Sequence, residues 1–366
     1  MKSKFAGSLL VNGMLAVICL LWTIPTFGLL VSSFRDRIDV NTSGWWTIFP
    51  HQDWVSVQEV TPDASVNRDV PMTFKADSGT SVTAPFEQLQ IGVEKDGYRF
   101  QWIGNRRVGY LEIQKYTWTS NTNFTLENYK QVLSSGNYTA ALKDGTTETA
   151  LGDNMTHAFL NSVAVAVPAT VIPIALAAFA AYGFAWMKFP GRKMLFALVV
   201  GLLVIPLQIA LIPILKDYVA LHVNGTFLAV WLAHTGFGLP LATYLMFNYI
   251  SELPRDILEA AFVDGASHFT IFTQLIVPLS VPALASFAIF QFLWVWNDYL
   301  VALIFIGASP TNQLITQRLA EIVGSRGQDW HLLTAGAFIT MILPLAVFFG
   351  LQRYFVRGMM AGSVKG

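Results

Sequence analysis

Six long apolar runs constrain this chain more than any other feature of its sequence. They cover residues 7–32, 158–184, 194–215, 226–249, 276–306 and 334–356. Each run is long enough for the roughly 20 residues with which an α-helix crosses a bilayer. Hydrophobic residues make up 54% of the chain and charged residues only 13%, which is too little polar surface for a soluble protein of this size. The sequence therefore predicts an all-α polytopic membrane protein with six transmembrane helices.

The basic residues outside these runs predict the orientation of the chain. The short segments on one side of the membrane hold Lys2, Lys4, Lys188, Arg192, Lys193, Arg255, Arg353, Arg357 and Lys365. The short segments on the other side hold only Lys216, Arg318 and Arg326. Because cytoplasmic loops are enriched in Lys and Arg, we expect both termini in the cytoplasm.

Residues 1–36 are predicted to be a cytoplasmic tail and a retained first transmembrane helix, not a signal peptide. The apolar run exceeds a typical signal-peptide core, and the sequence SFRDR follows it in place of a small-residue cleavage site. The segment that follows is then delivered to the outer side of the membrane.

Residues 37–155 differ from the rest of the chain, because polar residues dominate and apolar residues alternate with them. We expect strands at 54–60, 86–93, 98–103 and 108–118. Asp96-Gly97 is typical of a two-residue hairpin turn. The segment is therefore predicted to be a small β-rich insertion on the periplasmic or extracellular side, and residues 156–366 are predicted to form a core of five helices.

A polar segment at residues 250–277 separates the fourth and fifth apolar runs. Pro254 suits the first position of a helix, and Asp256 in the first turn complements the helix macrodipole. Gly265 tolerates the positive φ that ends a helix, and Ser267 is suited to cap a second one. The residues alone therefore predict an amphipathic helix-turn-helix at a membrane surface.

The residue order in this segment resembles a known signature. It reads Glu259-Ala260-Ala261, three residues, Gly265, nine residues, Leu275, one residue and Val277-Pro278. This order resembles the EAA motif of permease subunits of ABC importers, and EAAFVDGAS followed by PLSVP is similar to the carbohydrate-importing branch of that family. In the family the motif is a coupling helix that docks on a separate ATPase. The resemblance implies that the ATPase-coupling residues are Glu259, Ala260, Ala261, Asp264 and Gly265.

Two residues of this motif keep alternative interpretations. The simpler interpretation of Glu259 is a solvated surface charge that contributes under about 1 kcal/mol to stability. Asp264 either contacts the partner or caps the turn beside Gly265, and the sequence does not separate these two roles.

A second cluster of polar and aromatic residues lies in the predicted fifth helix. Trp294, Asn297 and Asp298 combine ring faces with amide and carboxylate groups, which is the mixture that sugar sites use. An acid at the bilayer centre costs about 2.5 to 3.5 kcal/mol, so Asp298 should face protein or water. Gln208, between two prolines of the third run, is a further candidate for the substrate pathway. The alternatives are an outer aromatic belt with one helix-to-helix hydrogen bond for the fifth helix, and such a bond for Gln208.

Further segments extend the resemblance to roughly residues 1–50 and 120–366. TLENY at 125–129, in an amphipathic helix predicted at 124–133, is similar to sugar-importer permeases, as are WNDYL at 296–300 and the C-terminal RYFVRGMM. The long outer insertion is similar in placement and size to that of α-glucoside permeases. The resemblance implies the type I ABC importer permease fold and a binding-protein-dependent importer of α-glucosides or other disaccharides, which works by alternating access.

The resemblance also implies the partners of the chain. They are a second homologous permease, a pair of ATPase subunits and a periplasmic or lipid-anchored solute-binding protein. The chain has no GxxxxGKS or GxxxxGKT phosphate-binding loop. We therefore expect ATP and Mg²⁺ on the partner ATPase, no cofactor on this chain, and a transport subunit rather than an enzyme. A formal net charge of zero indicates no nucleic-acid binding, and one cysteine and six dispersed histidines form no metal motif.

Two other classes of membrane protein are compatible with long apolar runs. An ion-coupled secondary sugar transporter would place several ionisable groups within its spans, whereas Asp298 and His234 are nearly the only ones here. A membrane-anchored receptor, in which the β-rich segment binds the ligand, would need fewer helices. The importer interpretation explains more of the sequence than either.

Overall fold

The computed structural model describes residues 2–62, 68–141, 147–326 and 329–361. Its internal contacts divide the chain into two compact units. The first unit combines Met1–Val31 with Ile38–Phe124, and the second combines Ser32–Arg37 with Thr125–Gly366. The predicted insertion, residues 37–155, therefore has parts in both units.

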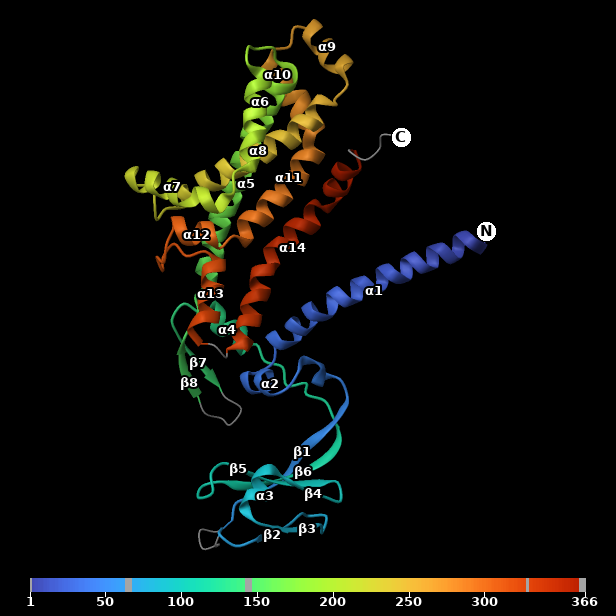
Figure 1. The fold of residues 1–366 in the computed structure, drawn as a ribbon, viewed down its shortest axis with the longest axis vertical. Coiled ribbons are helices and arrows are strands. Elements are labelled where there is room, and N and C mark those ends of the chain that lie inside the picture. Colours follow the sequence, from blue (N-terminus) through green and yellow to red (C-terminus); the bar gives the residue numbers. More distant parts are fainter. Residues whose placement is uncertain (1, 63–67, 142–146, 327–328, 362–366) are drawn as a thin grey trace. The chain divides into compact units, whose positions relative to one another are not determined.

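Long helices build the second unit (Figure 1). α5 (Met155–Trp186) packs along α8 (Phe227–Ser251), and α11 (Val277–Asn297) packs on both helices and on α14 (Trp330–Ala361). With α1 (Lys2–Ser33), five helices of the described ranges are long and apolar enough to cross a membrane, or six when one bent pair is a single span. The predicted helical membrane fold is confirmed.

Small side chains lie where α5 meets α8. Ala169, Ala177 and Ala181 of α5 and Ala229 and Ala242 of α8 are fully buried. Apolar area alone drives helices together weakly in lipid, so close contact between small residues stabilises such pairs. The alanines let these two helices approach along most of their length.

The shorter elements of the second unit connect the long helices. They are α4 (Glu127–Leu133), β7 (Asn137–Ala141), β8 (Thr147–Leu151), α6 (Arg192–Gly201), α7 (Leu207–Ala220), α9 (Arg255–Val263), α10 (His268–Ile271), α12 (Leu300–Phe305) and α13 (Ile315–Arg326). Just before α4, the Thr125 hydroxyl accepts a hydrogen bond from the Glu127 N–H at 3.1 Å.

The predicted third transmembrane helix is broken in two. α6, prolonged by a 3-10 turn at Leu202–Val204, meets α7 at an angle of 104°. Ile205 between them is extended (φ −74°, ψ 117°), since a residue that precedes proline avoids the helical region. Pro206 also has no N–H to continue the hydrogen-bond ladder. The bend follows from these two effects of one proline.

The fifth span does not keep its predicted bounds of 276 and 306. A helical stretch begins at His268, passes through a π-helical turn at Phe272–Ile276 and ends at Asn297. The backbone is extended at Asp298 (ψ 126°) before α12 begins. The prediction that Asp298 lies within the fifth helix is therefore wrong, because the chain leaves the helix at this residue.

Prolines inside the long helices free carbonyl groups, and side chains of neighbouring helices bind them. A proline removes the N–H that would bond to the carbonyl four residues earlier. Trp296 donates its indole N–H to the Thr340 carbonyl at 2.9 Å, four residues before Pro344. In the same way, the indole N–H of Trp231 binds the Ala164 carbonyl of α5 at 3.2 Å, four residues before Pro168. Each indole thus replaces a lost helical bond and joins two helices.

Gln291 does the same at the centre of the bundle. Its amide donates to the Ala169 carbonyl at 3.1 Å, four residues before Pro173, and to the His234 carbonyl at 3.3 Å. Gly238 of α8 makes room for this amide, because a Cβ there would lie 2.6 Å from the Gln291 Oε1. One buried side chain therefore connects α5, α8 and α11.

The first unit contains an antiparallel sheet of four strands in the order β1-β6-β5-β4. The strands are β1 (His51–Val60), β4 (Val93–Lys95), β5 (Tyr98–Ile103) and β6 (Tyr110–Thr119). One face packs on the hairpin of β2 (Met72–Lys75) and β3 (Ser81–Ala84) and on α3 (Phe86–Ile91), and this contact buries Leu89, Phe100 and Leu111 completely. The short elements α2 (Arg37–Thr42) and a 3-10 helix (Trp45–Ile48) precede the sheet.

Three of the four predicted strands are confirmed to within a few residues, and the strand at 86–93 is wrong. Asp96 and Gly97 form the predicted hairpin turn, with φ of 50° and 76°. The segment after Pro85 is helical instead of extended. Phe86 and Leu89 are three residues apart, which in a helix brings both into the core. Alternation was a misleading signal in so short a segment.

The indole-to-carbonyl contacts are testable by a double-mutant cycle. Trp296→Phe keeps an aromatic ring but removes the N–H that binds the Thr340 carbonyl. We expect the free energy of unfolding in detergent, followed by circular dichroism during denaturation, to fall by about 1 kcal/mol. In a Pro344→Ala background the carbonyl regains its helical donor, so the same substitution should cost much less. Equal costs in both backgrounds would contradict this role of Trp296.

Candidate functional site

The helix-turn-helix predicted at residues 250–277 is present. α9 follows Pro254 and carries Asp256 in its first turn. Gly265 ends it with a φ of 79°, in the left-handed region that residues with a Cβ rarely adopt. The Ser267 hydroxyl then accepts a hydrogen bond from the Thr270 N–H at 3.2 Å and caps the next helix.

The residues predicted to couple to an ATPase lie on the outside of the helical unit. Glu259, Ala260, Asp264 and Gly265 are exposed, and Ala261 is half-buried. Within the described ranges, the Asp264 carboxylate makes no hydrogen bond, so this side chain does not cap the turn. Both acidic side chains of the motif are therefore available to a partner.

Apolar side chains accompany these acids on the surface of α9. Ile257 and Phe262 are 42% and 40% exposed, and Val263 is 87% exposed. A short helix that exposes large apolar groups beside acids has the composition of a protein-binding surface. The opposite side is anchored, because Leu258 is buried in the cluster that contains Tyr182 of α5 and Ile250 of α8.

The turn after α9 is tied to the same cluster. The Tyr182 hydroxyl lies 2.8 Å from Nδ1 of His268, the first residue of α10. The ring of His268 also meets that of Phe262 edge to face, with centroids 5.1 Å apart. Because both ends of the turn contact the helical bundle, α9 is a fixed projection rather than a free loop.

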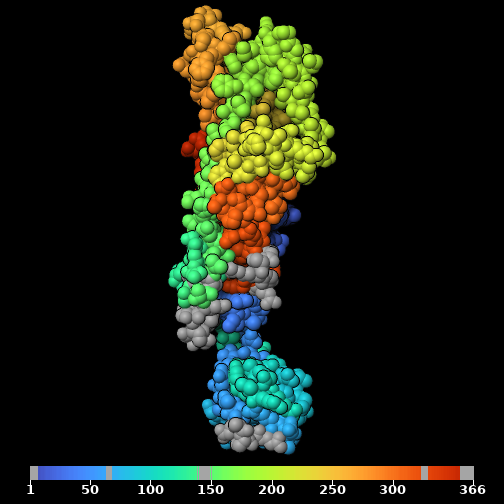
Figure 2. All heavy atoms as spheres, turned by 90° about the vertical axis from the view of Figure 1, so that its left-hand side faces the viewer, coloured from blue at the N-terminus to red at the C-terminus, as the bar shows by residue number. Residues whose placement is uncertain are grey.

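α9 lies at the same end of the helical unit as the loop that joins α5 to α6 (Figures 1 and 2). This loop and the first turn of α6 hold Lys188, Arg192 and Lys193, the basic residues that predict the cytoplasmic side. Lys188 and Lys193 are exposed, and Arg192 donates to the Met187 carbonyl at 2.9 Å. The basic residues and the exposed helix α9 therefore lie at the same end of the second unit.

A second site lies where the fifth span ends. The Asp298 carboxylate accepts a hydrogen bond from the Val301 N–H at 2.9 Å, which caps α12. The carbonyl of Asp298 accepts a bond from the Thr316 hydroxyl of α13, also at 2.9 Å. One residue thus holds together the end of α11 and the starts of α12 and α13.

His234 of α8 lies beside this carboxylate. Its Nε2 is 3.6 Å from the Asp298 Oδ2, and its ring meets Trp294 edge to face with centroids 5.0 Å apart. The side chain of His234 is 1% exposed and that of Asp298 is 11% exposed. The structure therefore brings together two of the predicted pathway residues, Trp294 and Asp298, and adds His234.

The two predicted amides are not part of this cluster. Asn297 is exposed, and its Nδ2 donates to the Leu293 carbonyl of its own helix at 2.8 Å. Gln208 is exposed near the start of α7, just after the break at Pro206.

Sequence interpretation missed two residues that position these elements. Gln291 had a detectable signal, since an isolated amide in an apolar span needs a hydrogen-bond partner. Thr316 had none, because it is a common residue far along the chain from Asp298. Within the described ranges, no group of three or more His, Cys, Asp or Glu side chains is placed to hold a metal ion.

These features define a multi-pass membrane protein that presents one anchored amphipathic helix to a partner. Residues 159–361 match the family model described as "Binding-protein-dependent transport system inner membrane component". The chain belongs to this family. It is therefore a permease subunit of an ABC importer, not an enzyme, and ATP hydrolysis belongs to a separate subunit.

Two relatives match almost the whole chain, including the β-rich first unit. The osmoprotective compounds uptake permease protein GgtD of Synechocystis sp. is 48% identical over 100% of this chain and 94% of its own length. The alpha-glucoside transport system permease protein AglG of Rhizobium meliloti is 46% identical over 96% of this chain and 95% of its own length. The predicted resemblance to α-glucoside permeases is confirmed.

The cap on α12 yields a stability prediction. Asp298→Ala should lower the free energy of unfolding by about 1 kcal/mol, because the Val301 N–H loses its acceptor. Asp298→Asn should cost much less, since asparagine caps helices as well as aspartate does. Asn297→Ala, a neighbour bonded only within its own helix, is the matched control. Equal losses for the Ala and Asn variants in a thermal denaturation assay would show that the charge beside His234, not the cap, holds the break.

Proposed function

We propose that this chain is the permease subunit of an ATP-driven importer of α-glucosides or related disaccharides, and that α9 is its coupling helix. The observation that carries the coupling assignment is the exposure of Glu259 beside apolar side chains on an anchored helix. The similarity to AglG, whose name gives α-glucoside transport, supports the substrate class.

A continuous helix would transmit movement from the ATPase to the pathway. The stretch from His268 to Asn297 has 30 residues, and it follows α9 after one short turn. At about 1.5 Å per residue it is long enough to cross the whole bilayer. A displacement of α9 would therefore move the far end of this helix, where Asp298 meets α12 and α13. Such a movement would tip the permease between inward-facing and outward-facing states.

The assembly proposed around the chain contains three kinds of protein partner. A second homologous permease completes the pathway, two ATPase subunits bind ATP and Mg²⁺, and a periplasmic or lipid-anchored solute-binding protein delivers the sugar. The basic loop beside α9 supports a cytoplasmic position for that end of the unit. Both termini are then cytoplasmic, and the β-rich part of the first unit, which follows α1 in the chain, is periplasmic or extracellular.

We further propose that the outer end of α11 borders the substrate pathway. Trp294 and Asp298 lie next to a break in a span, where backbone can line a cavity without contact with lipid. Gln208 lies just after the other break, with its amide exposed. Asn297 is exposed on the same turn as Asp298.

One observation favours an ion-coupled secondary transporter as a second candidate. Buried pairs of carboxylate and imidazole occur in proton-coupled transporters, and His234 and Asp298 form such a pair at 3.6 Å. Membership of the binding-protein-dependent family outweighs it, and the cap that Asp298 provides already accounts for the carboxylate.

Glu259→Lys tests the coupling assignment. We expect the sugar-stimulated ATPase rate of the reconstituted importer to fall by about tenfold or more, because the reversed charge would oppose a basic surface on the ATPase. Glu252→Lys, the same change on an exposed residue of the segment before α9, is the control. Subunit assembly is checked by size-exclusion chromatography. Full stimulation of the Glu259→Lys complex would make Glu259 a solvated charge and would refute the assignment.

A further inference from the structure

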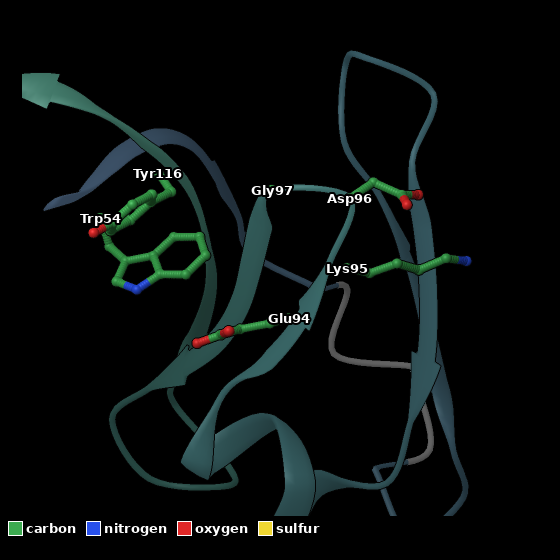
Figure 3. A pocket seen from close by; sticks show the side chains of 6 residues that line it. All are labelled: Trp54, Glu94, Lys95, Asp96, Gly97 and Tyr116. Carbon is green, nitrogen blue, oxygen red and sulfur yellow. The ribbon is translucent and has the colours of Figure 1, made fainter. Parts of the chain in front are cut away.

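The sheet of the first unit has one packed face and one open face, and the open face carries a depression (Figure 3). Its volume is 530 Å³, and Trp54, Glu94, Gly97 and Tyr116 line it. Glu94 points to the same side as the two aromatic rings, whereas the side chains of Lys95 and Asp96 at the rim point to the other side. The ammonium group of Lys95 already has a hydrogen-bond partner, because it donates to the Ser81 carbonyl at 2.9 Å.

The register of the sheet explains why the depression exists. Trp54 of β1 is directly opposite Tyr116 of β6, and their ring centroids lie 5.1 Å apart at a tilt of 55°. The Tyr116 N–H donates to the Gly97 carbonyl at 3.1 Å, so Gly97 takes the next place in the same row. Among the described residues other than its two chain neighbours, no atom lies within 4 Å of the position that a Cβ of Gly97 would occupy. The row therefore consists of two rings and a gap.

The neighbouring row of the sheet supplies a free carboxylate. Arg99 pairs with Glu94 across β4 and β5, but its guanidinium is turned to the Ile91 carbonyl at 3.0 Å. Among the residues that the structure describes, none donates a hydrogen bond to Glu94. Its two oxygens therefore remain available beside the rings.

Stabilisation of the pairing between β1 and β6 does not account for the exposed ring, the gap and the unbonded carboxylate. A cross-strand aromatic pair stabilises a sheet without any gap or acid beside it. Here Tyr116 keeps 48% of its surface exposed, and Trp118 two residues further along the same face keeps 67%. Rings that remain this accessible beside an unbonded carboxylate form the combination that binds a ring with one apolar face and hydroxyl donors.

We propose that this depression is a saccharide-binding site. One sugar ring lies with its C–H face on Trp54 and Tyr116, occupies the gap over Gly97 and donates a hydroxyl hydrogen to the Glu94 carboxylate. The class of ligand rests on the proposed function, and the site adds to that function a place where an α-glucoside is held outside the membrane pathway. It would raise the local sugar concentration on the side from which substrate arrives.

The charges on this face select against other ligands. Glu59 and Glu112 are directly opposite each other on the same face as Glu94. Burial raises the pKa of the Tyr110 hydroxyl, and these two carboxylates raise it further. The negative face disfavours anionic ligands. A quaternary ammonium ion is held best when rings enclose it, whereas here two tilted rings border one side of an open depression.

Saturation-transfer difference NMR on the full chain in lipid nanodiscs tests the site with maltose and trehalose as probes. We expect signals from both sugars or from one of them. Trp54→Ala and Tyr116→Ala should each weaken binding by up to about tenfold. Gly97→Asn should abolish binding although both rings remain, because asparagine tolerates the positive φ of this turn and its side chain fills the gap. Trp46→Ala removes a 62% exposed ring elsewhere in the same unit and should change nothing.

Several outcomes would overturn the proposal. These are no signal from either sugar in the parent chain, a signal that survives both Trp54→Ala and Gly97→Asn, or a signal from choline in place of the sugars. If the parent gives no sugar signal but Trp54→Ala weakens the affinity of the solute-binding protein, the face is a protein-docking surface instead. Far-UV circular dichroism of each variant checks that the sheet is intact.

The coupled assay separates this inference from the proposed function. At saturating sugar and binding protein, the Trp54→Ala importer should keep the sugar-stimulated ATPase rate of the parent. Glu259→Lys should lose that rate and keep the NMR signal of the bound sugar. Absence of sugar stimulation in the parent would refute the importer assignment, whereas absence of the NMR signal would refute only the site on the sheet.

Discussion

A backbone carbonyl inside a bilayer has no water to bind, and this requirement organises the helical unit. Three prolines, Pro168, Pro173 and Pro344, each free one carbonyl. The side chains of Trp231, Gln291 and Trp296 on adjacent helices bind these three carbonyls. An unsatisfied polar group in hydrocarbon costs several kcal/mol, so each proline makes one particular neighbour necessary. The prolines therefore do more than bend helices, because they specify which helices lie together and in which register.

The same requirement decides where a span can be interrupted. At Asp298 the freed groups are satisfied locally, because its carboxylate binds Val301 and its carbonyl accepts a bond from Thr316. The π-helical turn at Phe272–Ile276, by contrast, keeps the chain helical between α10 and α11. The fifth span is thus one continuous helical stretch, which begins just after the turn that follows α9 and ends at Asn297. A continuous helix with an anchored start and a capped end is suited to transmit the displacement of α9 that we propose.

Sequence signals succeeded where a single local property decided the structure. Apolar length predicted the long helices, and the tolerance of Gly265 and of Asp96-Gly97 for positive φ predicted a helix end and a hairpin turn. The hydroxyl of Ser267 predicted the cap of the next helix. They failed where a contact distant in the sequence decided. Asp298 leaves its helix where the Thr316 hydroxyl of α13 binds its carbonyl. Residues 86–91 form a helix because Phe86 and Leu89 both pack in one core. Such partners have no signature in a single sequence.

The two polar and aromatic clusters of the molecule differ in what their groups already bind. Asp298 is occupied by a helix cap and borders a histidine that is 1% exposed, so its side chain serves the fold before it serves a ligand. Glu94 borders the exposed ring of Tyr116 and the half-buried ring of Trp54, and it accepts no hydrogen bond from the described residues. A group that gives up no internal bond on binding contributes more to affinity, because no buried partner is left unsatisfied. The surface of the sheet is therefore better prepared to hold a sugar than the proposed pathway residues at the end of the fifth span.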